Sequence, residues 1–260
     1  MASIRTSLGA DGAVLHVLLD QPKANVLSMA MMTEIADALA AHRDRKNLKL
    51  VVLRGAGGNF SFGASVPEHQ RDTAPAMLKQ FHELVRRVAG YVVPVASLVE
   101  GRCLGGAFEL VLASHFVFAT PNAVFACPEI KLGVIPPVLS VLGPSRLGAP
   151  LAEQMLLTGM EIDARRAHAA GLVTEIVADA GGDPGEWLLA WFGRTLAPLS
   201  AFSLREATWA AREGSGMRTS LGAALDAVEA RYVERLLPSQ DGNEGIAAFL
   251  AKRPPKWVDA

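Results

Sequence analysis

Gly105-Gly106-Ala107-Phe108-Glu109-Leu110-Val111-Leu112-Ala113 is a run of glycine and apolar residues that contains one carboxylate. A run this apolar is expected to be buried, and an ionised carboxylate buried without a partner is strongly unfavourable. Glu129 stands out in the same way within Phe125-Ala126-Cys127-Pro128-Glu129-Ile130. Because each of these acids follows a chain reversal, the two together suggest a paired acid/base site.

The segments around this run alternate between the patterns of strands and helices. Apolar runs predict buried strands over residues 14–19, 48–53 and 94–99, and short strands over 117–119 and 124–125. The spacing of apolar residues predicts helices over 29–42, with Ser28 as N-cap, and over 75–89. This alternation predicts an α/β fold with a largely parallel sheet.

The character of the sequence changes after Gly181-Gly182-Asp183-Pro184-Gly185, where helical patterns replace strand patterns. Helices are expected over residues 187–196, 199–212 and 221–237. We therefore divide the chain into a core with the active site, residues 1–195, and a C-terminal helical region, residues 196–260. The second region is expected to serve assembly.

Composition excludes several classes of function. The chain has 260 residues, of which 50% are hydrophobic and 20% charged, and its formal net charge is −1. Such a chain can form a substantial core but has no overall field to attract nucleic acid or an anionic membrane. No apolar run approaches the ~20 residues of a membrane span, and the first residues lack a signal-peptide pattern. Cys103 and Cys127 are expected to be buried thiols, and the protein cytoplasmic.

Familiar cofactor and metal motifs are absent from the sequence. Neither glycine-rich loop, 55–58 or 101–106, has the spacing and position of a dinucleotide fingerprint, and no phosphate-binding P-loop occurs. The six histidines lack the spacing of a zinc site, and there is no nucleophile elbow of a serine hydrolase. We therefore expect no cofactor and no metal.

Gly105 and Gly106 open the helix that carries Glu109, so backbone N–H groups there are free and lie at the positive end of the helix dipole. Such donors can bind a developing oxyanion. Ala64 is the candidate for the second donor, because Gly63 before it permits an unusual backbone angle. Two carboxylates and two amides form the set that adds water to an activated double bond. The alternative to this functional interpretation is that Glu109 lies on a solvent-exposed helix face and that Glu129 is a surface loop residue.

An ordered set of motifs resembles the enoyl-CoA hydratase/isomerase (crotonase) superfamily. They are Gln21 to Leu27, Asn59 to Ala64, Glu100 to Glu109, Phe125 to Pro136, Leu157-Thr158-Gly159 with Ala164 and Ala167 to Val173, and Ala251 to Pro254. The resemblance implies a crotonase-like ββα superhelix with a C-terminal helical trimerisation region, and a homotrimer or dimer of trimers.

The resemblance also implies an acyl-CoA substrate, with no separate cofactor, whose thioester oxygen lies between the amides of Ala64 and Gly106. It implies that Glu109 deprotonates water and that Glu129 serves the α-carbon, and the presence of both favours a hydratase. Lys23 and Lys252, and also Lys256, are expected to meet the CoA phosphates. The remaining residues expected to bind the substrate are Phe62, Ser65, Val66, Gly105, Pro136 and Pro137.

Two departures from the family pattern bear on the acyl group. Ser65 stands where hydratases for linear chains commonly have aspartate, and Pro137-Val138-Leu139-Ser140 replaces a glycine-rich run. The bulkier, stiffer segment disfavours a straight-chain substrate. The run Phe60 to Val66, taken with Pro136-Pro137-Val138, resembles hydratases of cyclic dienoyl-CoA thioesters in anaerobic benzoyl-CoA breakdown. We hypothesise that the substrate is cyclohexa-1,5-diene-1-carbonyl-CoA.

Other functions remain open at this point. Within the family they are a general enoyl-CoA hydratase of fatty-acid β-oxidation, an isomerase, and a ring-opening acyl-CoA hydrolase. From another class, the chain could be a non-catalytic acyl-CoA-binding subunit. A nicotinamide oxidoreductase is disfavoured because the fingerprint is missing.

Overall fold

The computed structural model describes residues 2–21, 24–177 and 182–260, and its strands form two sheets. The larger sheet has the order β1-β2-β3-β4-β6-β9, and the smaller has the order β5-β7-β8. The strands are β1 (Ile4–Gly9), β2 (Val14–Leu19), β3 (Leu50–Gly55), β4 (Val95–Val99), β5 (Arg102–Leu104), β6 (Phe116–Ala119), β7 (Val124–Ala126), β8 (Glu161–Asp163) and β9 (Glu175–Ile176).

The larger sheet is parallel except for β1, which pairs antiparallel with β2. Its central strands β3 and β4 are almost wholly buried, as their continuous apolar sequences predict. The prediction of a largely parallel α/β sheet is therefore confirmed. Strand β1 was not predicted, because most of its residues are exposed and it has no buried apolar run.

The helices begin and end close to the predicted positions in the first half of the chain. They are α1 (Met29–His42), α2 (Ala74–Ala89), α3 (Gly106–Leu112), α4 (Pro137–Leu147), α5 (Ala149–Thr158), α6 (Ala164–Ala169), α7 (Pro184–Thr195), α8 (Ala201–Gly214), α9 (Met217–Thr219), α10 (Leu225–Arg231) and α11 (Gln240–Leu250). Ser28 caps α1 as predicted, because its Oγ accepts a hydrogen bond from the N–H of Met31 at 3.3 Å.

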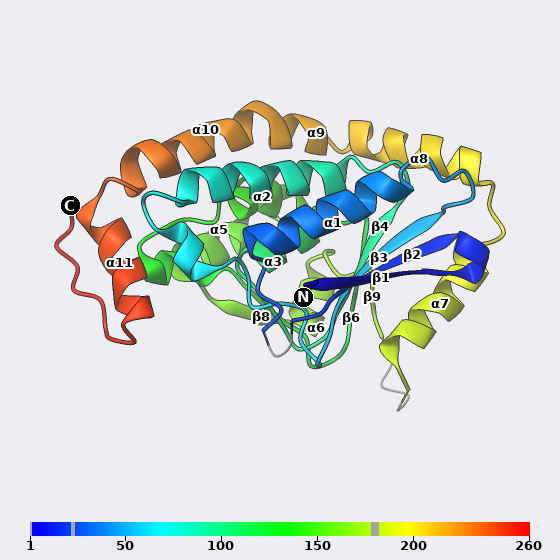
Figure 1. The fold of residues 1–260 in the computed structure, drawn as a ribbon, viewed down its shortest axis with the longest axis horizontal. Helices are drawn as coiled ribbons and strands as arrows, with labels where there is room; N and C mark the ends of the chain where they lie inside the picture. The colour runs from blue at the N-terminus through cyan, green and yellow to red at the C-terminus, as the bar shows by residue number, and fades with distance from the viewer. Residues whose placement is uncertain (1, 22–23, 178–181) are drawn as a thin grey trace.

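From Gly182 to Ala260 the structure describes every residue, and this part of the chain forms helices and no strand. Figure 1 shows α8, α9 and α10 running together across α2 and α1, with α11 at the far end. Two π-helical segments, Ser220–Ala224 and Tyr232–Leu236, lie on either side of α10. Helix α7 covers the other face of the large sheet, where Trp187 and Trp191 pack on Phe118.

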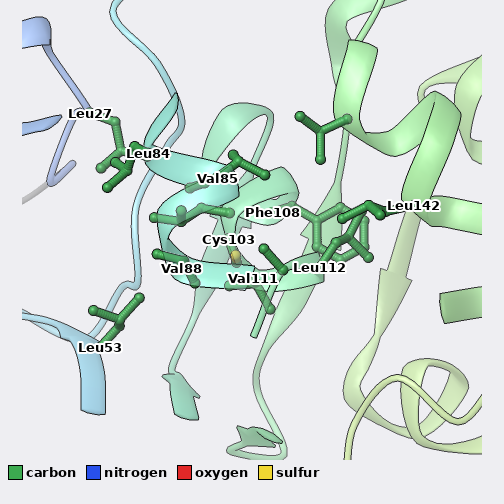
Figure 2. Close-up of a cluster of buried hydrophobic side chains, with 14 of the residues drawn as sticks. Leu27, Leu53, Leu84, Val85, Val88, Cys103, Phe108, Val111, Leu112 and Leu142 are labelled. Carbon is green, nitrogen blue, oxygen red and sulfur yellow. The ribbon is translucent and has the colours of Figure 1, made fainter. Parts of the chain in front are cut away.

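Helix α3 lies inside the main hydrophobic core, and all seven of its residues are buried. Figure 2 shows Phe108, Val111 and Leu112 from α3 surrounded by apolar side chains of α2, α4 and the strands. Cys103 and Cys127 are also buried and unpaired, as predicted. Within the described residues no helix is long and apolar enough to cross a membrane. The position of α3 carries Glu109 into the core.

Candidate active site

The Glu109 side chain is buried, with 3% of its surface exposed. Its Oε1 accepts hydrogen bonds from the backbone N–H groups of Val138 at 2.6 Å and Leu139 at 2.9 Å. Pro137 begins α4, so these donors belong to its first turn, where N–H groups have no partner within the helix. The N-terminus of α4 therefore stabilises the ionised form of Glu109.

The Glu129 carboxylate lies beside the glycine pair. Glu129 belongs to a 3-10 helix, Pro128–Leu132, and its Oε2 is buried without a hydrogen-bond partner among the described residues. A methyl group on Gly105 would lie 2.6 Å from Glu129 Oε1, and Gly105 has φ +52° and ψ −133°. Glycine at position 105 thus makes room for the Glu129 carboxylate and allows the backbone conformation.

The two carboxyl groups have different electrostatic surroundings. Burial raises the pKa of Glu109 above its ordinary value, and the N–H groups of Leu139 and Val138 oppose that rise. Burial raises the pKa of Glu129 too, and the nearby charge of Glu109 raises it further. Two amides of α4 favour the ionised form of Glu109, whereas on Glu129 only its own backbone N–H opposes the rise in pKa. We therefore expect Glu109 to ionise first and Glu129 to keep its proton. Two carboxyl groups in different surroundings are thus expected to differ in protonation at neutral pH.

This arrangement has a consequence for stability. An unfolded chain ionises both glutamates near the ordinary value of 4.5, whereas the folded protein keeps at least the proton of Glu129 to about pH 8. The folded state therefore binds more protons over that interval, and its free energy of unfolding falls as pH rises.

We expect Glu129→Gln to remove part of this dependence. Urea unfolding should show that the variant gains stability relative to the wild-type protein between pH 5 and pH 8, by more than about 1 kcal/mol. A difference between the two proteins that is the same at both pH values would contradict the assignment of a raised pKa to Glu129.

The backbone N–H groups of Ala64 and Gly106 lie close together. A methyl group on Gly106 would be 3.5 Å from Ala64 N and 3.3 Å from Ala64 Cβ. Neither N–H donates a hydrogen bond to another described residue. Gly63 has φ +98°, which turns the chain so that its carbonyl accepts from Leu27 N at 2.9 Å while the next N–H stays free. The predicted pair of amide donors is thus present as a geometric feature.

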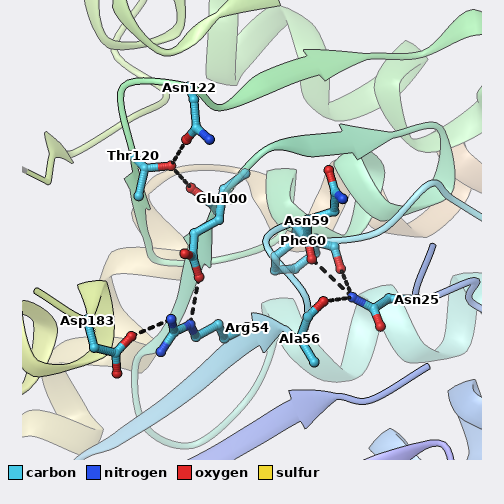
Figure 3. Close-up of polar contacts among 10 residues, drawn as sticks. Asn25, Arg54, Ala56, Asn59, Phe60, Glu100, Thr120, Asn122 and Asp183 are labelled. Carbon is cyan, nitrogen blue, oxygen red and sulfur yellow. Dashed lines mark hydrogen bonds and ion pairs between the residues drawn. The ribbon is translucent and has the colours of Figure 1, made fainter. Parts of the chain in front are cut away.

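A buried asparagine holds the loop before Ala64 in place. Asn25 Nδ2 donates to the carbonyl oxygens of Ala56 at 2.8 Å and Asn59 at 3.0 Å, and more weakly to that of Phe60, as Figure 3 shows. Phe62 N donates to the carbonyl of Ala24, so the Asn25 segment is also bound directly to the loop. The side chain of Asn25 therefore fixes the path of the chain toward Ala64.

Ionic contacts hold the loop that leads to Gly105. Arg54, at the end of β3, donates from Nε to Glu100 Oε2 at 2.7 Å and also pairs with Asp183 (Figure 3). The Arg54 guanidinium lowers the pKa of Asp183. The Glu100 carbonyl accepts from Phe60 N, so the loops that carry the two amide donors are connected.

A cavity of about 270 Å³ opens beside the amides and Glu129. Five residues predicted from the sequence line it, together with seven others; the lining residues are Phe62, Gly63, Ala64, Val66, His69, Leu104, Gly105, Pro128, Glu129, Leu132, Val134 and Phe249. Most of this lining is apolar, which suits a hydrophobic acyl group next to a small polar centre. Sequence reasoning missed His69 and Phe249; His69 lies four residues after Ser65, and Phe249 belongs to α11, which was not predicted.

Other predicted site residues do not line this cavity. Glu109 lies in the core, and Pro136 and Pro137 are buried at the start of α4, where they set the position of the amides that bind Glu109. Ser65 contributes its carbonyl to a hydrogen bond with His69 Nδ1 at 2.8 Å. Lys252 is exposed three residues after Phe249. Lys23 lies outside the described residues, among which no cluster of His, Cys, Asp or Glu could hold a metal ion.

Comparison with known proteins shows the family of the chain. The family model described as enoyl-CoA hydratase/isomerase matches residues 9–260. The chain belongs to the enoyl-CoA hydratase/isomerase family. It is similar over its whole length to a crystal structure of an enoyl-CoA hydratase from Mycobacterium avium subsp. paratuberculosis K-10, with 30% identity, a TM-score of 0.85, and 100% of each chain covered. The predicted crotonase-like fold with a helical C-terminal region is confirmed.

Two curated relatives in this family have names that specify a reaction. The chain is 42% identical to cyclohexa-1,5-dienecarbonyl-CoA hydratase from Thauera aromatica, covering 98% of this chain and 96% of the relative. It is 31% identical to carnitinyl-CoA dehydratase from Proteus mirabilis, covering 95% of both. Both names denote enzymes that add or remove water, which confirms the predicted enzyme class of hydro-lyase.

Proposed function

We propose that this protein adds water to a cyclic conjugated dienoyl-CoA thioester, cyclohexa-1,5-diene-1-carbonyl-CoA. The observation that carries the hydration chemistry is the buried pair Glu109 and Glu129 beside the free N–H groups of Ala64 and Gly106. The cyclic substrate is supported by the 42% identity to the Thauera aromatica enzyme over almost the whole chain.

In this proposal each group has one role. The N–H groups of Ala64 and Gly106 donate hydrogen bonds to the thioester oxygen and stabilise the enolate that forms. Glu109, ionised because its Oε1 is held by two amides, takes a proton from water, and the water oxygen bonds to the β-carbon. Glu129 gives its proton to the enolate carbon. The cycle closes when the proton on Glu109 is returned, through solvent or the pair, to Glu129.

The shape of α4 supports a compact acyl group. Pro136 and Pro137 fix the start of this helix, and Val138 and Leu139 are fully buried behind Glu109. A helix held in this way cannot move aside without breaking the two hydrogen bonds to Glu109. The cavity of about 270 Å³ is mostly apolar, and Phe249 from α11 is part of its lining. We infer that the pocket accepts a ring more readily than an extended chain.

A substrate panel tests this function. We expect incubation with cyclohexa-1,5-diene-1-carbonyl-CoA to give a product heavier by one water, and crotonyl-CoA to react at least about 10-fold more slowly, the scale on which pocket fit discriminates. Mass spectrometry of the products distinguishes hydration from isomerisation, which adds no mass, and from thioester hydrolysis, which releases CoA. Turnover of crotonyl-CoA without turnover of the cyclic thioester would overturn the proposed substrate.

Assembly and CoA binding complete the proposal. Exposed apolar side chains on the helical region, among them Phe202 at 74% and Trp209 at 58% exposure, are of the kind that subunit contacts cover. We propose a homotrimer or a dimer of trimers, which light scattering would detect. Lys252 and Lys256 are proposed to bind CoA phosphates at the end of α11.

A further inference from the structure

The phenol of Tyr232 is a buried polar group with no partner among the described residues. Tyr232 is 1% exposed, and its Oη lies among the buried side-chain atoms that make no hydrogen bond. Buried tyrosine hydroxyls usually find a hydrogen-bond partner, since leaving one unpaired is unfavourable. Glu129 Oε2 is another such orphaned atom.

Tyr232 lies in the helical region that packs on the elements around the glutamates. Tyr232 follows α10, which packs on α4, and the first turn of α4 binds Glu109. One turn earlier, Glu229 pairs with Nδ1 of the buried His82 on α2. The neighbouring Phe81 reaches the amide site, because its ring would lie 3.4 Å from a methyl group on Gly106. The segment that leads to Tyr232 is thus connected, through α4 and α2, to the elements that contact Glu109 and Gly106.

Electrostatics agree with this placement. Burial raises the pKa of the Tyr232 phenol, and the charges of Glu129 and then Glu109 raise it further. The phenol therefore stays protonated at neutral pH, so it can donate a hydrogen bond to a carboxylate but cannot act as a base.

We propose that Tyr232 is a positioning residue for the acid: its O–H donates a hydrogen bond to the Glu129 carboxylate as Glu129 gives its proton to the enolate. This inference rests on the hydration chemistry proposed above. Before proton transfer Glu129 is neutral, so the bond gains its full strength only when negative charge develops on the carboxylate. An interaction that strengthens in this way lowers the barrier without tightening substrate binding. Tyr232 keeps its own proton throughout.

Other titratable groups face this site and must be considered in any pH profile. Glu109 lies on α3, and Cys127 precedes the 3-10 helix of Glu129, where burial holds the pKa of its thiol well above the ordinary value. His69 lines the cavity, and burial lowers its pKa. His82 and Glu229 form the pair next to Tyr232, and burial lowers the pKa of His82. Among these groups, Glu109 and Glu129 are the carboxyl groups whose pKa values are raised.

Tyr232→Phe tests the proposal because it removes only the hydroxyl. We expect kcat to fall about 10-fold to 10²-fold with KM nearly unchanged, the range for a hydrogen bond to a charged group. Ionised Glu129 loses its donor, so its pKa rises and the alkaline limb of the pH–rate profile moves up by about one unit. Tyr91→Phe is the matched control: Tyr91 is also buried, and its hydroxyl donates to the Leu39 carbonyl at 2.8 Å. The Tyr91→Phe variant should leave both the acidic and the alkaline limb of the pH–rate profile unchanged.

Two further measurements keep the test decisive. Tyr91 and Tyr232 are the two tyrosines of the chain, so biosynthetic 3-fluorotyrosine in the Tyr91→Phe background alters position 232 alone. Its more acidic phenol is a stronger donor and should move the alkaline limb of the pH–rate profile to lower pH.

Infrared titration of the carboxyl groups in the free protein should show the same shifts without turnover. Wild-type protein that hydrates no thioester would refute the proposed function, whereas an unchanged carboxyl titration in Tyr232→Phe would refute the role of Tyr232.

Discussion

Replacing Glu109 by glutamine is expected to lower kcat/KM by about 10²-fold or more, the range associated with loss of a general base. The amide oxygen of glutamine can still accept from Val138 and Leu139, so the first turn of α4 keeps its contacts. What is lost is the ability to take a proton from water. Purified variant and wild-type protein should therefore unfold at similar urea concentrations and differ in steady-state hydration rate.

Glu34→Gln is the matched control for this experiment. Glu34 Oε2 also accepts two successive backbone N–H groups, from Ser3 at 2.8 Å and Ile4 at 3.0 Å, but it lies on α1 away from the cavity. Its replacement should change the hydration rate less than twofold, by roughly the effect of a surface substitution. Near-wild-type turnover by Glu109→Gln would refute the role of Glu109 as the base.

The order and type of the elements could be predicted where a segment is buried on a regular period. Strands β2, β3 and β4 and helices α1 and α2 fall within two residues of the expected ranges, because apolar spacing reports burial directly. Helices α4 and α5 were not predicted. Pro137 and Pro144 both lie in α4, and proline ordinarily signals a break, although the first turn of a helix tolerates it.

The site could be predicted from the sequence only where a residue differs sharply in polarity from its neighbours in the chain. Glu109 and Glu129 are charged residues in apolar runs. Gly105, four residues before Glu109, has a backbone angle that other residues rarely adopt. His69, Phe249 and Tyr232 give no such signal. Each has an ordinary place in its helix, and its relation to the site arises only from the packing of segments distant in sequence.

Gly105→Ala is expected to abolish most activity, with a loss of about 10²-fold or more, because it displaces a carboxylate without removing it. The new methyl group would lie 2.6 Å from Glu129 Oε1, closer than real contacts allow, so the carboxylate has to move. A displacement of about 1 Å at a reacting group can lower the rate by about 10²-fold. The backbone angle of φ +52° adds a destabilisation of about 1–2 kcal/mol, since alanine disfavours positive φ.

The two effects of Gly105→Ala separate when it is compared with Gly148→Ala. Gly148 has φ +79° and ψ +142°, another conformation that favours glycine, but a methyl group there meets no atom within 4 Å. Both variants should unfold at lower urea concentration than the wild-type protein, because both carry backbone strain, and only Gly105→Ala should lose hydration activity in the folded state. Equal activity in the two folded variants would mean that the Glu129 carboxylate tolerates displacement, and its assignment as the proton donor would then be wrong. The same comparison also shows whether glycine at position 105 serves the backbone turn alone or, as we expect, the space that Glu129 occupies.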